Sequence, residues 1–234
     1  IIGHIFNGFI DRTVVGIREL LIQKEDWILR QLKTAYEMGV RQVLVGNLGH
    51  IALAKQAGFS VRGDFGLNIF NSRSMRAVHD LGLESQLLSF EMSVPQLRDV
   101  SKDIPAEVMV YGRLPLMLTE NCVMKNRTGT CTCQTTSVRL VDRKGEEFPV
   151  IGDAGTCRNV ILNGKKMYLL DKLHAFRGIG LYVGSVVITH FDQHAAAAES
   201  FQKRLESLGL RVYRHYAIPN YPYDVEYICS EAGF

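Results

Sequence analysis

The chain has 234 residues, of which 47% are hydrophobic and 22% are charged, with a formal net charge of +3 at pH 7. These values are typical of a soluble globular protein with one large domain or two small ones. The net charge is too small to indicate nucleic-acid binding by itself, although a local basic patch would not be visible in the total. The longest apolar runs, such as residues 181–188, are too short to span a membrane.

Residues 1–10 lack a positive segment followed by a small-residue cleavage site, so the sequence predicts no signal peptide. We therefore expect a cytoplasmic protein without a membrane partner. A weak helix is expected from Val14 to Ile22. A stronger helix is expected from Glu25 to Met38, because its apolar residues recur near a 3.6-residue period and acidic residues occupy its first turn.

A repeated pattern follows, in which glycine ends a helix and a short apolar run comes two or three residues later. It predicts four strands, ending with residues 107–111, that alternate with three helices at residues 49–57, 71–81 and 94–103. Such alternation at about twenty-residue spacing indicates consecutive αβ units and a parallel sheet. The predicted fold class is therefore α/β.

Polar residues follow each of these predicted strands. Ligands of parallel sheets bind at the carboxyl ends of the strands, where such residues meet. A carboxylate there could act as a general base, and a guanidinium could clamp an anion. Loop Asn and Asp residues are also common as turn formers and helix caps, so both interpretations stay open. The candidates are Glu91, Asp64 and Arg113 for catalysis, and Asn47, His50 and Asn68 for substrate binding.

The regular alternation of predicted helices and strands does not continue in the second half of the chain. Residues 138–151 predict a β-hairpin with its turn at residues 143–146. The elements expected after the hairpin are a helix at Leu169–Phe176, a strand at Tyr182–Thr189, a helix at Ala195–Leu208, a strand at Arg211–Ile218 and a loop-like tail over residues 220–234.

Four of the five cysteines lie between Tyr111 and Leu170, with the spacing C-x8-C-x-C-x23-C. A disulfide framework is not expected, because the number is odd and a cytosolic environment keeps thiols reduced. The remaining interpretations are a soft metal or iron–sulfur site and buried free thiols. The four candidate metal ligands are Cys122, Cys131, Cys133 and Cys157, whereas Cys229 is expected in the core.

Residues from about 36 to 173 resemble the collagenase-like peptidases of family U-32. The matching phrases are VLVGNLGHIALAKQAGF, GDFGLNIFNSRS, LSFEMS, VYGRLPLMLTENC, DRKGEEFPV and CRNVILN. The resemblance implies a TIM-like barrel, which is expected to be partial because the sequence shows only about four βα units. It also implies a 4Fe-4S cluster held by the cysteines, with zinc as the alternative. Related sequences often carry a further cysteine where this chain has residues 134–137.

The last stretch, from about His174 to Phe234, is similar to a bacterial family of unknown function, number 1846. The matching phrases are AFRGIGLYVGSVVIT, RLESLGLRVYRHY and YPYDVEYICSEAGF. The expected organisation is a partial TIM-like barrel over residues 1–173, with a cysteine-bearing β-rich insertion at 112–170. A short Rossmann-like βαβ segment is expected over residues 174–234.

The resemblance implies an enzyme with an iron–sulfur centre that acts on a peptide, an RNA or a small anionic substrate. Peptide hydrolysis is the reaction for which the family is named, and RNA modification suits a cluster. The alternative is a non-catalytic binding or structural module, with an incomplete barrel and cysteines that are structural or bind zinc.

Overall fold

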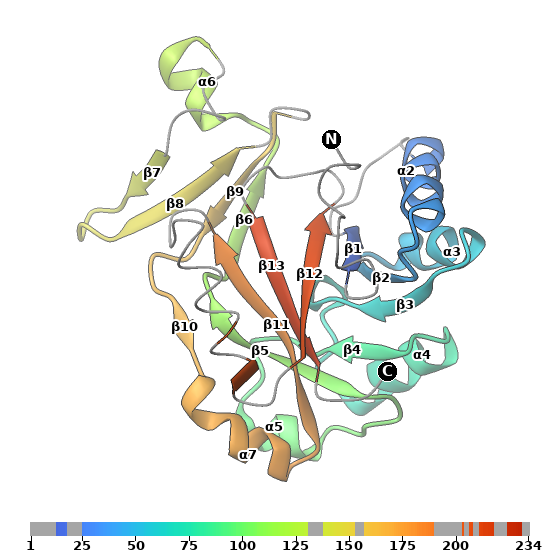
Figure 1. The fold of residues 1–234 in the computed structure, drawn as a ribbon. Coiled ribbons are helices and arrows are strands. Elements are labelled where there is room, and N and C mark those ends of the chain that lie inside the picture. Colours follow the sequence, from blue (N-terminus) through green and yellow to red (C-terminus); the bar gives the residue numbers. More distant parts are fainter. Residues whose placement is uncertain are drawn as a thin grey trace.

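The computed structural model shows an α/β protein with two sheets (Figure 1). No helix among the described residues is long and apolar enough to cross a membrane. The structure describes residues 13–17, 25–130, 138–152, 157–189, 203, 206–207, 211–217 and 224–230.

Five strands in the first half of the chain each pair in parallel with the next one along the sequence. This confirms the predicted run of αβ units and adds one strand at its start. The strands are β1 (Thr13–Ile17), β2 (Gln42–Val45), β3 (Ser60–Gly63), β4 (Ser85–Leu87) and β5 (Ala106–Gly112).

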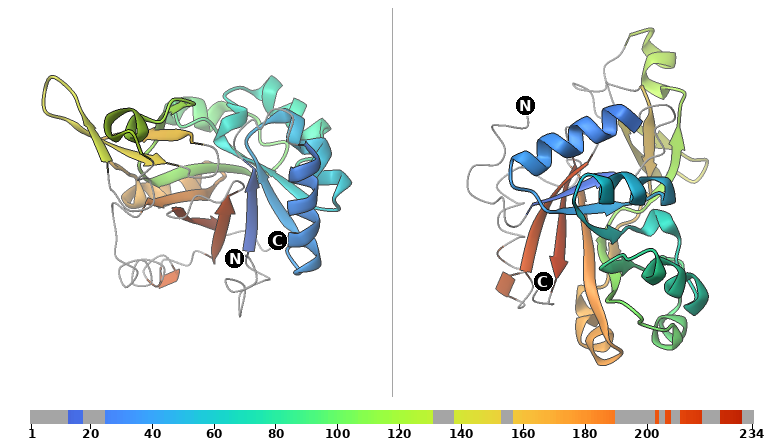
Figure 2. Two further views of the ribbon diagram at one scale, coloured as in Figure 1. Left: turned by 90° about the horizontal axis from the view of Figure 1, so that it is seen from above. Right: turned by 90° about the vertical axis from the view of Figure 1, so that its right-hand side faces the viewer.

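The helices between these strands lie together on one side of the sheet (Figure 2). They are α2 (Glu25–Glu37), α3 (Leu48–Gln56), α4 (Ser72–Asp80) and α5 (Val94–Asp99), with a 3₁₀ turn η2 (Phe65–Leu67) after β3. Their apolar stripes and alternate strand residues share one core, which includes Ile28 and Leu32 of α2 and Val43 and Val45 of β2.

Three later strands extend the same sheet. β11 (Leu181–Thr189) pairs in parallel with β5, and β12 (Arg211–Ala217) pairs in parallel with β1. β13 (Asp224–Ser230) lies between them and is antiparallel to both. The sheet is therefore mixed, and its strands come from both halves of the chain. The predicted division of the chain at residue 174 stays a prediction.

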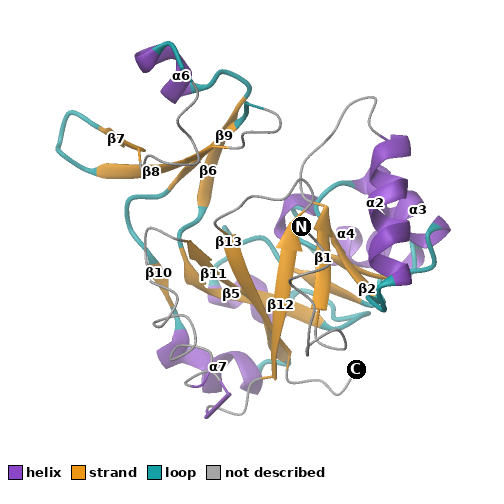
Figure 3. Cartoon of the chain, turned by 45° about the horizontal axis from the view of Figure 1, so that its top comes forward, coloured by secondary structure: helices purple, strands orange, loops and turns teal. Residues whose placement is uncertain are grey.

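A second sheet, antiparallel and four-stranded, is inserted between β5 and β11. Its order is β6-β9-β8-β7, and it projects beside the first sheet with a short helix at one end (Figure 3). The predicted hairpin is confirmed by β7 and β8. The elements of this segment are β6 (Pro115–Thr119), α6 (Val123–Thr128), β7 (Val138–Val141), β8 (Glu147–Gly152) and β9 (Asn159–Leu162).

The chain returns to the first sheet through three short elements. β10 (Met167–Tyr168) pairs antiparallel with β5, and a 3₁₀ turn η3 (Leu170–Lys172) leads into α7 (Leu173–Gly178). These elements confirm the helix that was predicted near residues 169–176. The predicted helix at 195–208 lies almost wholly outside the described residues.

Two predictions were wrong. Residues 13–17, assigned in part to a helix, form β1, where the β-branched Val14, Val15 and Ile17 suit a strand. The tail that was expected to be a loop contains β13, where Val225, Tyr227 and Ile228 have the same preference. β1 pairs with β12, which lies far away in the sequence, whereas β13 pairs with β11 and with the preceding strand β12.

A buried ion pair joins three of the parallel strands on the face opposite the helices. Arg62 of β3 and Glu107 of β5 are in direct contact, and the side chain of each is only 3% exposed. The Arg62 Nε atom also donates a hydrogen bond of 2.9 Å to the hydroxyl of Ser85 on β4. Buried charges require such partners, because water no longer solvates them.

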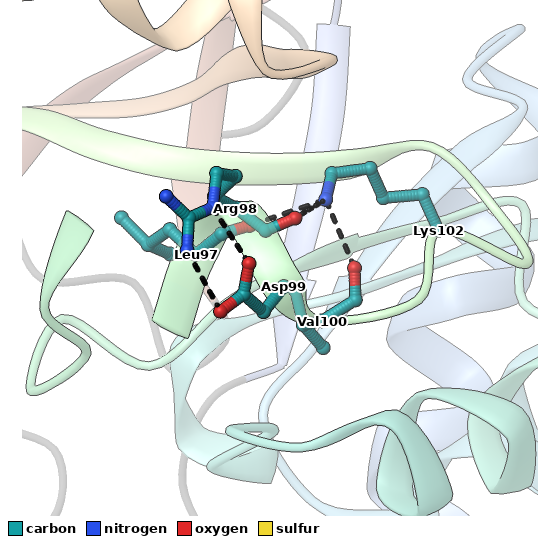
Figure 4. Close-up of polar contacts among 5 residues, drawn as sticks. All are labelled: Leu97, Arg98, Asp99, Val100 and Lys102. Carbon is teal, nitrogen blue, oxygen red and sulfur yellow. Dashed lines mark hydrogen bonds and ion pairs between the residues drawn. The ribbon is translucent and has the colours of Figure 1, made fainter. Parts of the chain in front are cut away.

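The last turn of α5 is closed by a lysine (Figure 4). The Lys102 Nζ atom donates to the carbonyl oxygens of Leu97, Arg98 and Val100 at 3.1, 3.0 and 2.9 Å, which satisfies carbonyls that the helix leaves unpaired. Burial lowers the pKa of the Lys102 ammonium, and the charge of Asp99 opposes this shift. The hydrogen bond from Arg98 lowers the pKa of Asp99.

The loops after β2 and β3 touch through two glycines. A Cβ atom placed at Gly66 would lie 2.6 Å from the carbonyl oxygen of Gly46, which is closer than real Cβ atoms approach. The Asp64 amide also donates a 2.9 Å hydrogen bond to the Val45 carbonyl. Gly66 thus allows the ends of two neighbouring strands to stay in contact.

Replacement of Glu107 by Ala should destabilise the protein by about 3–5 kcal/mol, because it leaves the Arg62 charge buried without this carboxylate. The double substitution Arg62→Met with Glu107→Leu should recover most of the loss, since an apolar pair removes both charges. Urea unfolding of the three proteins measures the difference. A single substitution that costs less than about 1 kcal/mol would show that the pair is not a buried charge contact.

Gly66→Ala should cost about 1–3 kcal/mol, because the added methyl group must displace the backbone of Gly46. Gly178→Ala in α7 is the matched control, since a Cβ atom there meets nothing within 4 Å. The control should leave stability unchanged or raise it by up to about 1 kcal/mol. Equal thermal unfolding curves for both variants would contradict the close approach.

Candidate functional site

The loops that follow β2, β3 and β4 form one continuous edge, which we call the strand-end rim and define as residues 46–49, 64–71 and 88–94. Parallel pairing brings the carboxyl ends of these strands to the same side. The Ser89 amide donates to the Ile69 carbonyl at 3.0 Å, and the Phe65 and Phe90 rings lie 5.6 Å apart. The three loops therefore support one another.

The buried side chain of Gln86 holds the rim loop that follows β3. This side chain is fully buried, and its Nε2 atom donates to the carbonyl oxygens of Asp64 at 3.2 Å and Leu87 at 2.6 Å. A Cβ atom at Gly63 would fall only 1.8 Å from the Gln86 Oε1 atom, so glycine leaves the space that this side chain fills. Gln86 thus ties the end of β3 to β4.

Two predicted site residues act as helix caps. The Asn47 side chain accepts a 2.8 Å hydrogen bond from the Gly49 amide at the start of α3. Asp64 is fully buried, and its Oδ1 atom accepts a 2.8 Å hydrogen bond from the Phe65 amide at the start of η2. The sequence allowed these residues to be either helix caps or functional residues, and in the structure both act as caps. The capping hydrogen bonds hold the rim loops in place.

The other predicted rim residues differ in their exposure. Asn68 is exposed and ends η2 in the left-handed conformation, with a φ of 51°. Glu91 is also exposed, and its backbone amide donates a 3.4 Å hydrogen bond to the Ser89 hydroxyl oxygen. His50 is buried in the first turn of α3, at 4% exposure. Glu91 is therefore the predicted catalytic carboxylate that solvent and ligands can reach.

Arg113 lies just beyond β5, where the chain leaves the first sheet for the second. Its Nη1 atom donates to the Asn163 carbonyl at 2.9 Å and also to the Gly164 carbonyl. It lines a polar cavity of about 170 Å³ together with Arg139, Glu146, Glu147, Pro149 and Gly164. Arg113 thus joins the two sheets, and its predicted role as an anion clamp stays a prediction.

A smaller, largely apolar cavity of about 40 Å³ lies beside the rim. Rim residues Phe90 and Met92 form part of its wall, and Met109 of β5 and Phe176 of α7 form another part. Such a space holds about two or three water-sized spheres. The cavity therefore offers room for the end of one aliphatic side chain next to the rim.

The predicted metal ligands lie only partly within the described residues. Cys122 is buried, and its sulfur accepts from the Lys125 amide at 3.4 Å and from Asn159 Nδ2 at 3.8 Å. Cys157 is exposed with a φ of 59°, two residues before Asn159. Cys131 and Cys133 lie outside the described residues. In the part of the chain that the structure describes, no group of three or more His, Cys, Asp or Glu side chains could hold a metal ion.

The sequence reasoning missed three apolar residues of the rim. Leu48, Phe70 and Val94 are 61%, 53% and 50% exposed. Each lies at the start of a helix: Leu48 and Val94 are the first residues of α3 and α5, and Phe70 directly precedes the cap of α4. A large apolar residue at this place in three successive βα loops is the sequence signal that could have revealed them.

The C-terminal part of the chain matches a family described as Domain of unknown function DUF1846, N-terminal, over residues 163–234. Similar proteins include a UPF0371 protein of Streptococcus equi subsp. zooepidemicus, 46% identical over 65 residues, and UPF0371 protein SpyM50764 of Streptococcus pyogenes, 45% identical over 65 residues. These matches cover 28% of this chain and 13% and 12% of the relatives, so the chain spans only a small part of their length.

No solved structure matches the chain. The family described as Peptidase family U32 matches residues 21–189, which is well over half of the 234 residues. This range contains the whole strand-end rim, the second sheet and the four clustered cysteines. The chain belongs to Peptidase family U32.

Proposed function

We propose that the chain carries the catalytic region of a hydrolase that cleaves peptide bonds at the strand-end rim. Membership of Peptidase family U32 supports the reaction class. The observation that carries the proposal is the position of Glu91, an exposed carboxylate on a rim whose three loops brace one another.

Glu91 would act as the general base in this reaction. Its carboxylate takes a proton from a water molecule, and the water oxygen attacks the carbonyl carbon of the peptide bond. The proton then passes to the departing amine as the carbon–nitrogen bond breaks. Asp64 is buried and engaged in capping, so it serves the reaction by positioning the loop.

The partial TIM-like barrel is part of the same proposal. Consecutive parallel pairing from β1 to β5 supports it, as does the further parallel pairing of β11 with β5. In barrels of this kind the loops after the strands carry the chemistry, which agrees with the place of Glu91. The Rossmann-like character of residues 174–234 also remains a proposal.

An iron–sulfur cluster held by Cys122, Cys131, Cys133 and Cys157 is proposed as the cofactor, with zinc as the alternative. One contact supports this proposal. Asn159 contacts the Cys122 sulfur, and Cys157 lies two residues before Asn159 in the sequence. N–H donors aimed at a sulfur atom, as at Cys122, help to stabilise a thiolate ligand. When bound, the cluster would supply electron transfer.

Glu91→Gln should lower the rate of hydrolysis of fluorescein-labelled casein by about 10²–10⁴-fold, because the amide cannot accept the proton. Glu84→Gln is the matched control, since Glu84 is exposed and directly precedes β4, at the opposite end of that strand. The release of labelled fragments measures both rates. Equal rates for the two variants would contradict the role of Glu91, and absence of cleavage by the unaltered protein would favour the non-catalytic module.

Cys122→Ser should release bound iron from anaerobically purified protein, whereas Cys229→Ser should retain it. The reason is that a hydroxyl is a poor ligand for this soft metal site, while Cys229 lies on β13, outside the proposed ligand set. Elemental analysis and absorbance near about 400 nm, typical of thiolate-bound iron–sulfur clusters, measure the content. Equal iron in both variants, or no iron in the unaltered protein, would refute the cluster.

A further inference from the structure

The rim combines exposed apolar side chains with an unusual charge composition. Its loops, residues 46–49, 64–71 and 88–94, contain Asp64 and Glu91 but no lysine or arginine. Nucleic-acid binding depends on cationic side chains that neutralise phosphates. The loops of the rim therefore offer no cationic side chain of their own to the phosphates of RNA, which was one of the substrates that the sequence left open.

The apolar residues of the rim come from loops that contact one another. Leu48 lies in the same loop as Gly46, which is in close contact with Gly66 of the next loop. Phe70 follows Ile69, and the Ile69 carbonyl accepts a hydrogen bond from the Ser89 amide of the third loop. Val94 ends the loop that contains Ser89. Each of these three side chains is at least half exposed, so each is accessible to a ligand that lies along the three loops.

The chemistry next to these side chains defines the ligand further. Glu91 is exposed, lies three residues before Val94 in the same loop, and places a negative charge on the rim that favours a nearby cation. The apolar cavity of about 40 Å³ opens beside Phe90 and Met92 in the same loop. A ligand that offers large apolar side chains, a cationic group and a main chain without phosphate fits this combination.

We propose that Leu48, Phe70 and Val94 form an apolar docking surface for extended polypeptide segments that carry large apolar side chains beside a lysine or arginine. Burial of each apolar contact supplies the affinity. The negative charge of Glu91 favours a cationic residue nearby without a direct ion pair, so the carboxylate stays available as a base. This inference rests on the proposed function for its site, and it adds the kind of segment that is selected.

The test is binding measured by fluorescence anisotropy in the Glu91→Asp background, which keeps the charge and slows cleavage. Three labelled probes are compared: a peptide of Leu, Phe and Lys, the same peptide with Ser in place of Leu and Phe, and a single-stranded oligouridylate. We expect the first peptide to bind at least about tenfold more tightly than either of the others, since each buried apolar side chain contributes about that factor or more.

The combined substitution Leu48→Ser, Phe70→Ser and Val94→Ser should weaken binding of the apolar peptide by about 100-fold or more, and Phe70→Ser alone by about tenfold. Val141→Ser is the matched control, because Val141 is 63% exposed but belongs to the second sheet. It should leave binding unchanged.

Three outcomes would overturn the inference: equal peptide binding by the combined variant and the control, tighter binding of the oligouridylate, or a rim that is covered by a second copy of the chain. Sedimentation reveals the last case, since the combined variant would then turn a dimer into a monomer. Peptide selectivity without any cleavage of casein would refute the proposed function alone. Cleavage without peptide selectivity would refute this inference alone.

Discussion

The parallel pairing of β2, β3 and β4 is the constraint on which the rest of the structure depends. It places three βα loops at one edge, where backbone contacts between Gly46 and Gly66 and between Ile69 and Ser89 join them. A rim built in this way is held by main-chain geometry as much as by side chains. Its exposed side chains can therefore serve a ligand, while buried residues such as Gln86 and Asp64 hold the loops in position.

The opposite face of the same strands contains a charged contact. Arg62, Ser85 and Glu107 bridge three strands in a place where apolar residues would also fill the space. A buried ion pair contributes little net stability, but removal of one partner costs a great deal. We infer that the contact favours one register of β3 against β4 and β5, since a shift by one residue would turn these side chains toward the helices.

Much of the first half of the fold was predictable from local signals. Glycine at helix ends, the 3.6-residue apolar period of α2 and short apolar runs identified α2 to α5 and β2 to β5. β1 and β13 were missed because their pairing with β12, β2 and β11 cannot be seen in local sequence patterns. Among the site residues, the sequence could not decide between caps and ligands: Asn47 and Asp64 are caps, whereas Glu91 is exposed. Leu48, Phe70 and Val94 were missed because residue type alone does not show exposure, and their shared place at the start of three successive helices was not used.

The central claim is that an apolar, cation-bearing polypeptide binds across the three loops of the rim. The most direct measurement is the mapping of backbone amide chemical shifts while the Leu, Phe and Lys peptide is titrated into the isotope-labelled protein. The account predicts that the largest shifts fall in residues 46–49, 64–71 and 88–94. Shifts centred on the second sheet, between residues 115 and 162, or an absence of shifts at saturating peptide, would contradict it.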